Sequence, residues 1–411
     1  MNAMEGILTK TEQMLHTYLQ NLGLSPVIKL LDKNLCQMGD LLVQSKIDSE
    51  MRLDEQALLT ASKDFPLPFG AISIVNNVAH IWLDRVAAFR ATLTQKEWEC
   101  TTRATNDGSS IYVEEPTSNE WATMSLTEFR ADMLRTIVKN CFIHAGYTVV
   151  QKAGPPEEDH NHDGNTMQVK IVHQKSKVLS QQCIEVLCGN VLTGSETQNA
   201  AQYISMRAND MQLIAQHRYG LRLPDVNKMQ TLVSSLGRSA AMVDMLHTSH
   251  TNVIDMRNQQ GILRNQCSSK GASFIMYNYA RMASILKKHT ELVENGELGV
   301  IPPVHEIDFA LLTDPDEWLL LYAYLMRFPN VVQQTIGYGE LVGRIAPYHL
   351  LNFTLCMIKC LSKYYRRVRI LTENRPKLQP VMLARLYLIR AVFNMLRVIL
   401  KILDLEPIEE M

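Results

Sequence analysis

Basic side chains gather near the carboxyl end of the 411-residue chain, in a pattern suited to binding phosphate groups. Residues 359–401 contain eleven of the 41 lysines and arginines and a single acidic residue, Glu373. The segment therefore has a formal charge of +10, whereas the rest of the chain, with 30 basic and 41 acidic residues, has −11. Because the whole chain has a net charge of only −1, this segregation predicts a local surface that binds a polyanion.

Two amphipathic helices are expected to position these cations. A helix over about 356–371 would turn by about 100° per residue, placing its cations on one face and Leu361 and Tyr364 on the opposite face. A second helix, over 381–403, has a polar stripe within an otherwise apolar surface. If the apolar faces pack together, the cations form one basic face. The residues predicted to bind RNA are Lys359, Lys363, Arg366, Arg367, Arg369, Arg385, Arg390, Asn394, Arg397 and Lys401.

The basic segment has three possible interpretations. It could bind RNA or another polyanion, it could meet an acidic protein partner, or it could consist of two helices with solvated lysines and arginines. Exposed helices usually mix charges of both signs, because pairs three or four residues apart stabilise them. One acid among twelve charges favours the polyanion, with an acidic protein as the main competitor.

Four segments in the last third of the chain resemble the anticodon-binding domain of arginyl-tRNA synthetases. The first, GASFIMYNYARMASIL, is similar without gaps to the family pattern TGPYLQYAHARICSIL. The family's two glycine positions in the closing segment hold Ile399 and Asp404. The resemblance implies a helical bundle of the DALR anticodon-binding type over residues 270–411. The four segments are Gly271–Leu286, Glu317–Val332, Leu361–Leu371 and Arg385–Met411.

The preceding part of the chain alternates strands and helices. Residues 71–84 predict two strands around an Asn-Asn turn. A strand at 110–115, a helix at 126–145 and a strand at 147–150 have the order and short links of a parallel α/β unit. Apolar spacing near the amino end predicts helices there. We therefore expect a helical segment over 1–60, an α/β domain over 61–256 and an all-α domain over 270–411.

The α/β half also resembles a class I arginyl-tRNA synthetase, but neither nucleotide-binding signature is present. In that family a His-x-Gly-His motif holds the ATP phosphates; the matching positions here hold Ser125, Thr127 and Glu128. A glutamate there would repel phosphate. The family's Lys-x-Ser-Lys loop has only a faint counterpart at 268–270. The resemblance implies a degenerate synthetase-like Rossmann domain with no catalytic residue, no metal and no cofactor.

The combination of a degraded catalytic half and an intact bundle resembles a group of DALR-domain proteins. Members of that group are understood to bind arginine tRNAs and to act with a methyltransferase-like enzyme that forms 3-methylcytidine in the anticodon loop. The resemblance implies a non-enzymatic adaptor with those two partners. A divergent arginyl-tRNA synthetase and a protein-only scaffold are the alternatives. Since the chain contains no Gly-x-Gly-x-Gly turn, we do not expect it to bind S-adenosylmethionine itself.

Other chemistry-bearing residues have simpler explanations. Trp318 is expected to be a core anchor, with a base-stacking platform as the alternative. Tyr277 and Arg281 are expected to be packing or hinge residues, with contact to RNA as the alternative. The eight cysteines form no Cys-x-x-Cys, the amino end lacks the pattern of a secretory signal, and no apolar stretch is long enough to span a bilayer, so a cytoplasmic protein is expected. Three groups could in principle bind a metal, although core packing or solvation is the favoured explanation: Cys356 with Cys360; Asp159, His160, His162 and Asp163; and Asp244 with His247 and His250.

Overall fold

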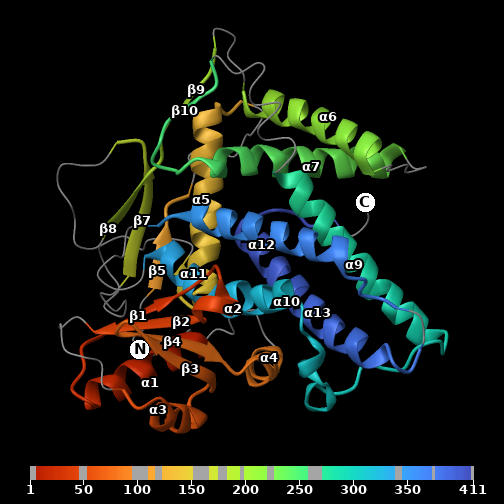
Figure 1. Cartoon of the computed structure of the whole chain (residues 1–411). Coiled ribbons are helices and arrows are strands. Elements are labelled where there is room, and N and C mark those ends of the chain that lie inside the picture. Colours follow the sequence, from red (N-terminus) through yellow and green to blue (C-terminus); the bar gives the residue numbers. More distant parts are fainter. Residues whose placement is uncertain are drawn as a thin grey trace.

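The computed structural model describes residues 6–45, 53–94, 110–115, 123–150, 166–174, 183–194, 199–219, 226–257, 271–337, 345–372 and 375–408. In Figure 1, an antiparallel sheet with its helices lies at one end of the molecule. A parallel sheet lies beside the long helix α5, and the helices of the last third occupy the opposite side. The described part of the chain contains no helix that is both long and apolar enough to cross a membrane.

The amino-terminal part is an antiparallel sheet with the strand order β1-β2-β4-β3. The expectation that 1–60 is a helical segment is wrong, because β1 and β2 are short strands between helices. Since β2 pairs with β4, the boundary predicted at residue 60 cuts through this sheet. The elements are α1 (Ile7–Asn21), β1 (Pro26–Leu30), α2 (Leu35–Met38), β2 (Leu41–Ser45), α3 (Glu55–Ala61), η1 (Ser62–Asp64), β3 (Phe69–Val75), β4 (Val78–Leu83) and α4 (Arg85–Leu93).

The predicted hairpin at 71–84 is confirmed by β3 and β4, which pair in antiparallel register. Asn76 and Asn77 form its turn with φ angles of 51° and 61°. Two consecutive positive φ angles match the twist of a two-residue hairpin turn, and asparagine tolerates them better than most residues. The local sequence therefore determines this turn.

The α/β part contains a parallel sheet with the order β6-β5-β7-β8, which confirms the predicted strand–helix–strand unit. Helix α5 connects β5 to β6, and Gly146, at φ 88°, ends the connection. The short strands β9 and β10 pair separately, and α6 and α7 form a helical hairpin (Figure 1). The elements are β5 (Ser110–Val113), α5 (Leu126–His144), β6 (Thr148–Val150), β7 (Thr166–Val172), β8 (Cys183–Leu187), β9 (Val191–Leu192), α6 (Ala200–Tyr219), α7 (Val226–His247) and β10 (Ile254–Asp255).

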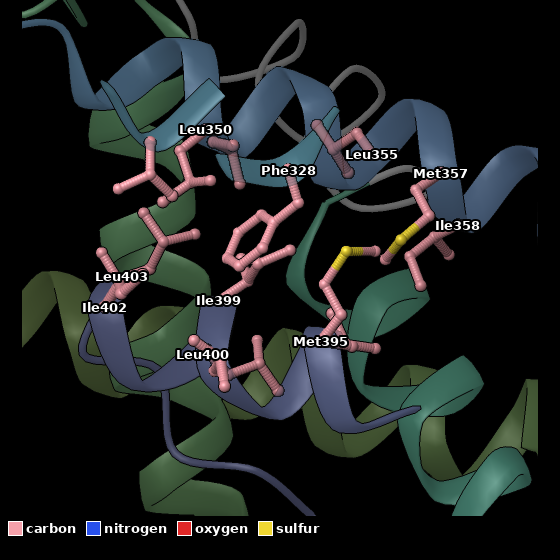
Figure 2. Packing of buried hydrophobic residues seen from close by; sticks show 14 of the residues in the cluster. Phe328, Leu350, Leu355, Met357, Ile358, Met395, Ile399, Leu400, Ile402 and Leu403 are labelled. Carbon is pink, nitrogen blue, oxygen red and sulfur yellow. The ribbon is translucent and has the colours of Figure 1, made fainter. Parts of the chain in front are cut away.

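From residue 271 onward, every regular element in the described chain is helical, as predicted. Figure 2 shows Phe328 between apolar side chains of α12, such as Leu350, and of α13, such as Ile399. All three are buried. The elements are α9 (Ala272–Glu294), η2 (Val304–Glu306), η3 (Phe309–Leu311), α10 (Pro315–Leu319), the π-helical turn η4 (Leu320–Leu325), α11 (Phe328–Ile336), α12 (Pro347–Arg367) and α13 (Gln379–Ile402).

The carboxyl end of α13 is fixed to the α/β part. The Asn140 side-chain amide of α5 donates to the Lys401 carbonyl at 3.1 Å. Arg238 of α7 forms an ion pair with Asp404 at 2.6 Å. Asp404 has a φ of 55°, so this position, where the family pattern has glycine, keeps a left-handed backbone that glycine adopts most easily.

The antiparallel sheet is joined to the bundle through Asp40. Its buried carboxylate accepts hydrogen bonds from the Trp318 indole at 2.8 Å and from the Leu83 amide at 2.9 Å. The Tyr322 hydroxyl donates to the Asp40 carbonyl at 2.5 Å. Trp318 is 2% exposed, which confirms that it is a core anchor and excludes its use as a base-stacking platform.

Candidate nucleic-acid interface

Helix α12 has the predicted division between a basic and an apolar face. Its four cations are exposed, whereas Leu361 and Tyr364 are buried. The helix ends at Arg367, four residues earlier than predicted, and the exposed Arg369 lies beyond its end. The residues on the basic face are Lys359, Lys363, Arg366 and Arg367.

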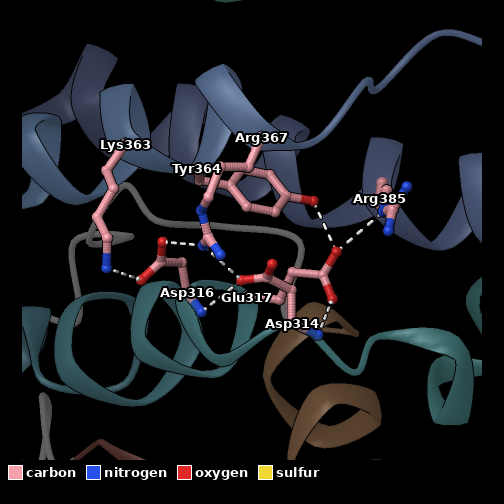
Figure 3. Close-up of polar contacts among 7 residues, drawn as sticks. All are labelled: Asp314, Asp316, Glu317, Lys363, Tyr364, Arg367 and Arg385. Atoms are coloured by element: carbon pink, nitrogen blue, oxygen red, sulfur yellow. Dashed lines mark hydrogen bonds and ion pairs between the residues drawn. The ribbon is translucent and has the colours of Figure 1, made fainter.

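Half of that basic face is occupied by acidic side chains of α10 (Figure 3). The Lys363 ammonium group lies 3.2 Å from one carboxylate oxygen of Asp316, and Arg367 binds the other. Arg367 also contacts Asp314 at 3.0 Å. The hydrogen bond to Asp316 is the main reason why the pKa of Arg367 is raised above its usual value. These two cations therefore already have anionic partners.

A third predicted cation, Arg385 of α13, is engaged at the same acidic turn. Its Nε donates to Glu317 Oε1 at 2.9 Å, and the Tyr364 hydroxyl donates to the same oxygen at 2.7 Å. Glu317 is fully buried, so these two donors compensate a charge that water cannot reach. The other Glu317 oxygen accepts from the Asp314 amide and completes a helix capping box. Arg385 therefore contributes to the core of the bundle.

The structure does not contain the one continuous basic face that the sequence predicts. Lys363, Arg367 and Arg385 meet Asp314, Asp316 and Glu317, which makes that cluster electrically neutral. The acids lie outside the 359–401 window, so counting charges inside the window could not detect them. The predicted basic face is therefore interrupted by acidic partners at these three positions.

A row of cations on α13 remains exposed. Arg390, Arg397 and Lys401 are spaced seven and four residues apart, which places them on one side of the helix, with Asn394 half-buried between them. Within the described ranges, none of the three cations has an ion-pair partner. Their role in binding RNA stays a prediction. We call Arg390, Arg397 and Lys401 the α13 row.

Three further cations near α12 are exposed. Lys359, Arg366 and Arg369 also have no ion-pair partner among the residues that the structure describes. Arg281 of α9, by contrast, lies with its guanidinium 4.7 Å from the centre of the Tyr365 ring, which supports the predicted packing role. The unpaired members of the predicted site are therefore the α13 row and these three cations.

The positions of the missing His-x-Gly-His motif form the amino end of α5. Ser125 caps the helix: its hydroxyl accepts from the Glu128 amide at 3.2 Å, and the Glu128 carboxylate accepts from the Ser125 amide at 2.8 Å. Hydrogen bonds from Ser125 hold the pKa of Glu128 below its usual value. The Thr127 hydroxyl accepts from the Val191 amide at 2.9 Å. All three side chains therefore bind within the chain. The Lys-x-Ser-Lys counterpart at 268–270 lies outside the described residues.

A buried arginine closes the same end of α5. Arg130 is 1% exposed, and its guanidinium donates to the carbonyls of Gly189 at 2.8 Å, Asn252 at 2.7 Å and Ser249 at 2.9 Å. Burial lowers its pKa, and carbonyl dipoles take the place of a carboxylate. A Cβ at Gly189 would lie 2.3 Å from the Asn252 carbonyl oxygen, so only glycine fits there. No local pattern in the sequence predicts this arginine site, because its partners lie 59 to 122 residues further along the chain.

The structure brings together no metal site from the predicted candidates that it describes. Cys356 is exposed, whereas Cys360 is buried and its burial raises the thiol pKa to about 12, which disfavours the thiolate that binds metals. Asp244 forms a 2.8 Å ion pair with Arg207. His250 is buried and held neutral, because burial lowers its pKa to about 4. The candidate loop containing Asp159, His160, His162 and Asp163 lies outside the described residues.

Comparison with known proteins assigns the helical bundle. Residues 275–411 match the model of the DALR anticodon binding domain. The chain is 30% identical over 233 residues to DALR anticodon-binding domain-containing protein 3 from Danio rerio, which covers 55% of this chain and 41% of that protein. The protein of that name from Rattus norvegicus is 36% identical over 143 residues, or 34% of this chain and 27% of that protein.

The fold of the whole chain matches that of arginyl-tRNA synthetases. The Thermus thermophilus enzyme superimposes with a TM-score of 0.68 and 13% sequence identity, covering 97% of this chain and 99% of that chain. At that identity the match establishes the fold alone: a synthetase-like α/β part followed by a DALR bundle. The chain spans less than half the length of the curated relatives that it matches.

Proposed function

We propose that this chain, which ends in a DALR anticodon-binding domain, is a cytoplasmic tRNA-binding adaptor without aminoacylation activity. The domain match over residues 275–411 is the observation that carries the proposal. In this function the bundle recognises arginine tRNAs around the anticodon arm. The α/β part serves as a rigid platform that docks a methyltransferase-like enzyme, which forms 3-methylcytidine in the anticodon loop.

The α13 row supports a role in binding phosphates. Its three cations protrude from one side of a helix that is otherwise deeply packed in the bundle. A rigid helix with cations at intervals of one and two turns can follow a phosphate backbone while contributing little to sequence discrimination. Lys359, Arg366 and Arg369 can add further contacts. Selection of arginine tRNAs therefore depends on groups other than this row.

The closed amino end of α5 supports the absence of synthetase activity. Helix amino termini bind phosphates through free backbone amides. Here the Ser125 hydroxyl binds the Glu128 amide in a capping box, and the adjoining loop is fixed by Arg130. The Glu128 carboxylate, with its lowered pKa, adds a negative charge where a nucleotide would need positive ones. In this function the partner enzyme carries out the methylation, and this chain selects the tRNA.

Two assays test this function with the purified chain. Filter binding should give saturable binding to an arginine tRNA transcript that is tighter than binding to a tRNA of another amino acid. Arginine-dependent exchange between ATP and pyrophosphate should stay at the level without protein. Robust exchange would instead establish the competing function, a divergent arginyl-tRNA synthetase.

A third measurement distinguishes the adaptor from a scaffold that binds only proteins. When the chain is captured from cells with its partners, RNase treatment should release the methyltransferase-like enzyme only in part, because the adaptor contacts both RNA and protein. Capture of partners that is wholly independent of RNase, together with no binding of purified tRNA, would favour the scaffold.

A further inference from the structure

The exposed cations of α12 differ in whether they have an ion-pair partner, and the proposed function does not use this difference. Lys363 and Arg367 have side chains that are 69% and 47% exposed, yet both bind the carboxylate of Asp316, which is 5% exposed (Figure 3). Lys359, one turn before Lys363, is exposed and has no ion-pair partner in the described chain. Two surface cations are therefore held by one buried acid.

Because Asp316 is buried, separating these ion pairs costs the carboxylate more free energy than it costs the two exposed cations. Ion pairs between two exposed side chains contribute little, because water and salt solvate the separated charges well. A buried carboxylate, in contrast, loses its compensation when its partners leave and cannot regain it from solvent. A phosphate that approached Lys363 or Arg367 would have to separate them from Asp316 or share them with it. The acid therefore outcompetes a phosphate for these two cations.

The wider cluster gives the same result. Asp314 adds a second carboxylate to Arg367, and Glu317 holds Arg385 of the neighbouring helix. Three cations and three carboxylates cancel, so this part of the surface attracts no counterions that binding of RNA could release. Only cations outside the cluster then contribute to the salt dependence of binding.

We propose that Asp316 closes a latent polyanion site formed by Lys363 and Arg367, and thereby limits binding of RNA to the α13 row and the unpaired cations near it. This inference deepens the proposed function, on which it rests. Its consequence is selectivity: an open site would bind any phosphate backbone and would raise affinity for unrelated RNA. The negative charges of α10 keep the bundle from becoming a general RNA-binding surface.

The test compares the parent chain with Asp316→Asn, which keeps the shape of the side chain and removes its charge. Affinity is measured by filter binding across a series of salt concentrations, with an arginine tRNA and with a single-stranded uridine oligomer. Asp316→Asn should bind both RNAs roughly three- to tenfold tighter at low salt, and should steepen the salt dependence by one to two phosphate contacts. Equal affinity and slope for the two proteins would overturn the proposal.

A second variant removes the cations together with their acids, so that the cluster stays neutral. Asp314→Asn and Asp316→Asn combined with Lys363→Gln and Arg367→Gln should leave affinity and salt slope unchanged, because these cations do not contact RNA in the parent chain. A loss of affinity with a slope lower by about two would overturn the proposal even if Asp316→Asn fails to fold. The uridine oligomer separates this test from the proposed function: should the parent chain not bind tRNA, a gain with the oligomer still supports the latent site, and no gain contradicts it.

Discussion

Arg130 is a buried cation whose partners are all neutral. Its guanidinium joins the end of β8 to the loop before β10 through the carbonyls of Gly189, Ser249 and Asn252. Replacement by methionine keeps much of the length but removes every donor. We expect Arg130→Met to lower the free energy of unfolding by about 3 kcal/mol, because buried carbonyls lose their partners.

Urea denaturation of both proteins at neutral pH measures this change. Binding of tRNA by the folded variant should stay within a factor of about two of the parent value, since the hydrogen bonds of Arg130 go to carbonyls of the α/β part and to no residue of the α13 row. A loss of stability below about 0.5 kcal/mol would mean that the carbonyls find other donors and that Arg130 does not hold this loop.

His250 gives the molecule a predictable response to acid. Its side chain is buried, and burial, followed by the positive charges of Arg130 and His349, lowers its pKa to about 4. In the unfolded chain the pKa is about 6.5, so protons bind the unfolded state more strongly and stability falls as the pH drops from about 6.5 towards 4. From this residue alone we expect a loss of about 2 kcal/mol between pH 7.5 and pH 5.

Since other groups also titrate, the measurement is a difference between two proteins. His250→Gln cannot be protonated, so its stability should fall by about 2 kcal/mol less than that of the parent over this range. Parallel urea titrations at the two pH values decide the matter. Identical pH dependences would show that His250 is not held neutral.

Helices α12 and α13 have similar sequences of charges and apolar residues, but they differ in what packs against them. The cations of α12 that face α10 meet acids, whereas the α13 row is exposed and has no ion-pair partner among the described residues. We therefore expect Arg390→Glu with Arg397→Glu to weaken tRNA binding strongly and to lower the salt slope by about two, whatever the tRNA sequence. Filter binding across salt concentrations measures both quantities.

A matched control separates local contact from net charge. Lys10→Glu with Lys29→Glu changes the charge by the same amount on exposed positions of α1 and β1, within the antiparallel sheet region. This control should keep most of the affinity, and both variants should unfold at the same urea concentration as the parent. Unchanged binding by the α13 variant, or an equal loss in the control, would remove the α13 row from the interface.

The helices, strands and turns that could be predicted are those that a short stretch of sequence determines by itself. The hairpin with its two asparagines and the strand–helix–strand unit around α5 follow from turn residues and periodicity. Strands β1 and β2 were missed, because each has five residues and the two lie among helical patterns. Their partner strands β3 and β4 lie further along the chain, so no local pattern reveals the pairing.

The candidate site shows the same limit. The exposed cations of α13 follow from helical spacing alone. The partners of Lys363, Arg367 and Arg385 lie 47 to 68 residues earlier in the chain, and only the folded bundle brings them together. The charge of a surface depends on neighbours in space, and sequence windows do not report those neighbours.

At the scale of the whole molecule, contacts between Asp40 and Trp318 join the antiparallel sheet to the helical bundle. Trp318 of α10 donates to the buried Asp40, and Arg85 lies 5.2 Å from the centre of the Trp318 ring. Trp318→Phe removes the donor and part of the buried ring. We expect it to lower the free energy of unfolding by about 3 kcal/mol, since it leaves a buried carboxylate oxygen unpaired and creates a cavity.

Trp82 provides the matched control for this joint. Like that of Trp318, its indole donates a hydrogen bond. The acceptor is the Leu35 carbonyl at 3.0 Å, and the Trp82 side chain is only half-buried. Trp82→Phe should cost about 1 kcal/mol or less. Hydrogen exchange should speed up in β1 and β2 of Trp318→Phe while α9 stays protected. Equal losses in the two variants would show that the Asp40 contact does not join the two parts.

The central claim, that the anticodon-binding bundle binds arginine tRNAs through the α13 row, is tested most directly by sequencing the RNA that crosslinks to the intact protein in cells. We expect arginine tRNAs to be enriched over their abundance, with crosslinks concentrated in the anticodon arm and reduced in Arg390→Glu with Arg397→Glu. Crosslinked RNA that simply follows cellular abundance, or that contains no tRNA above background, would contradict the account.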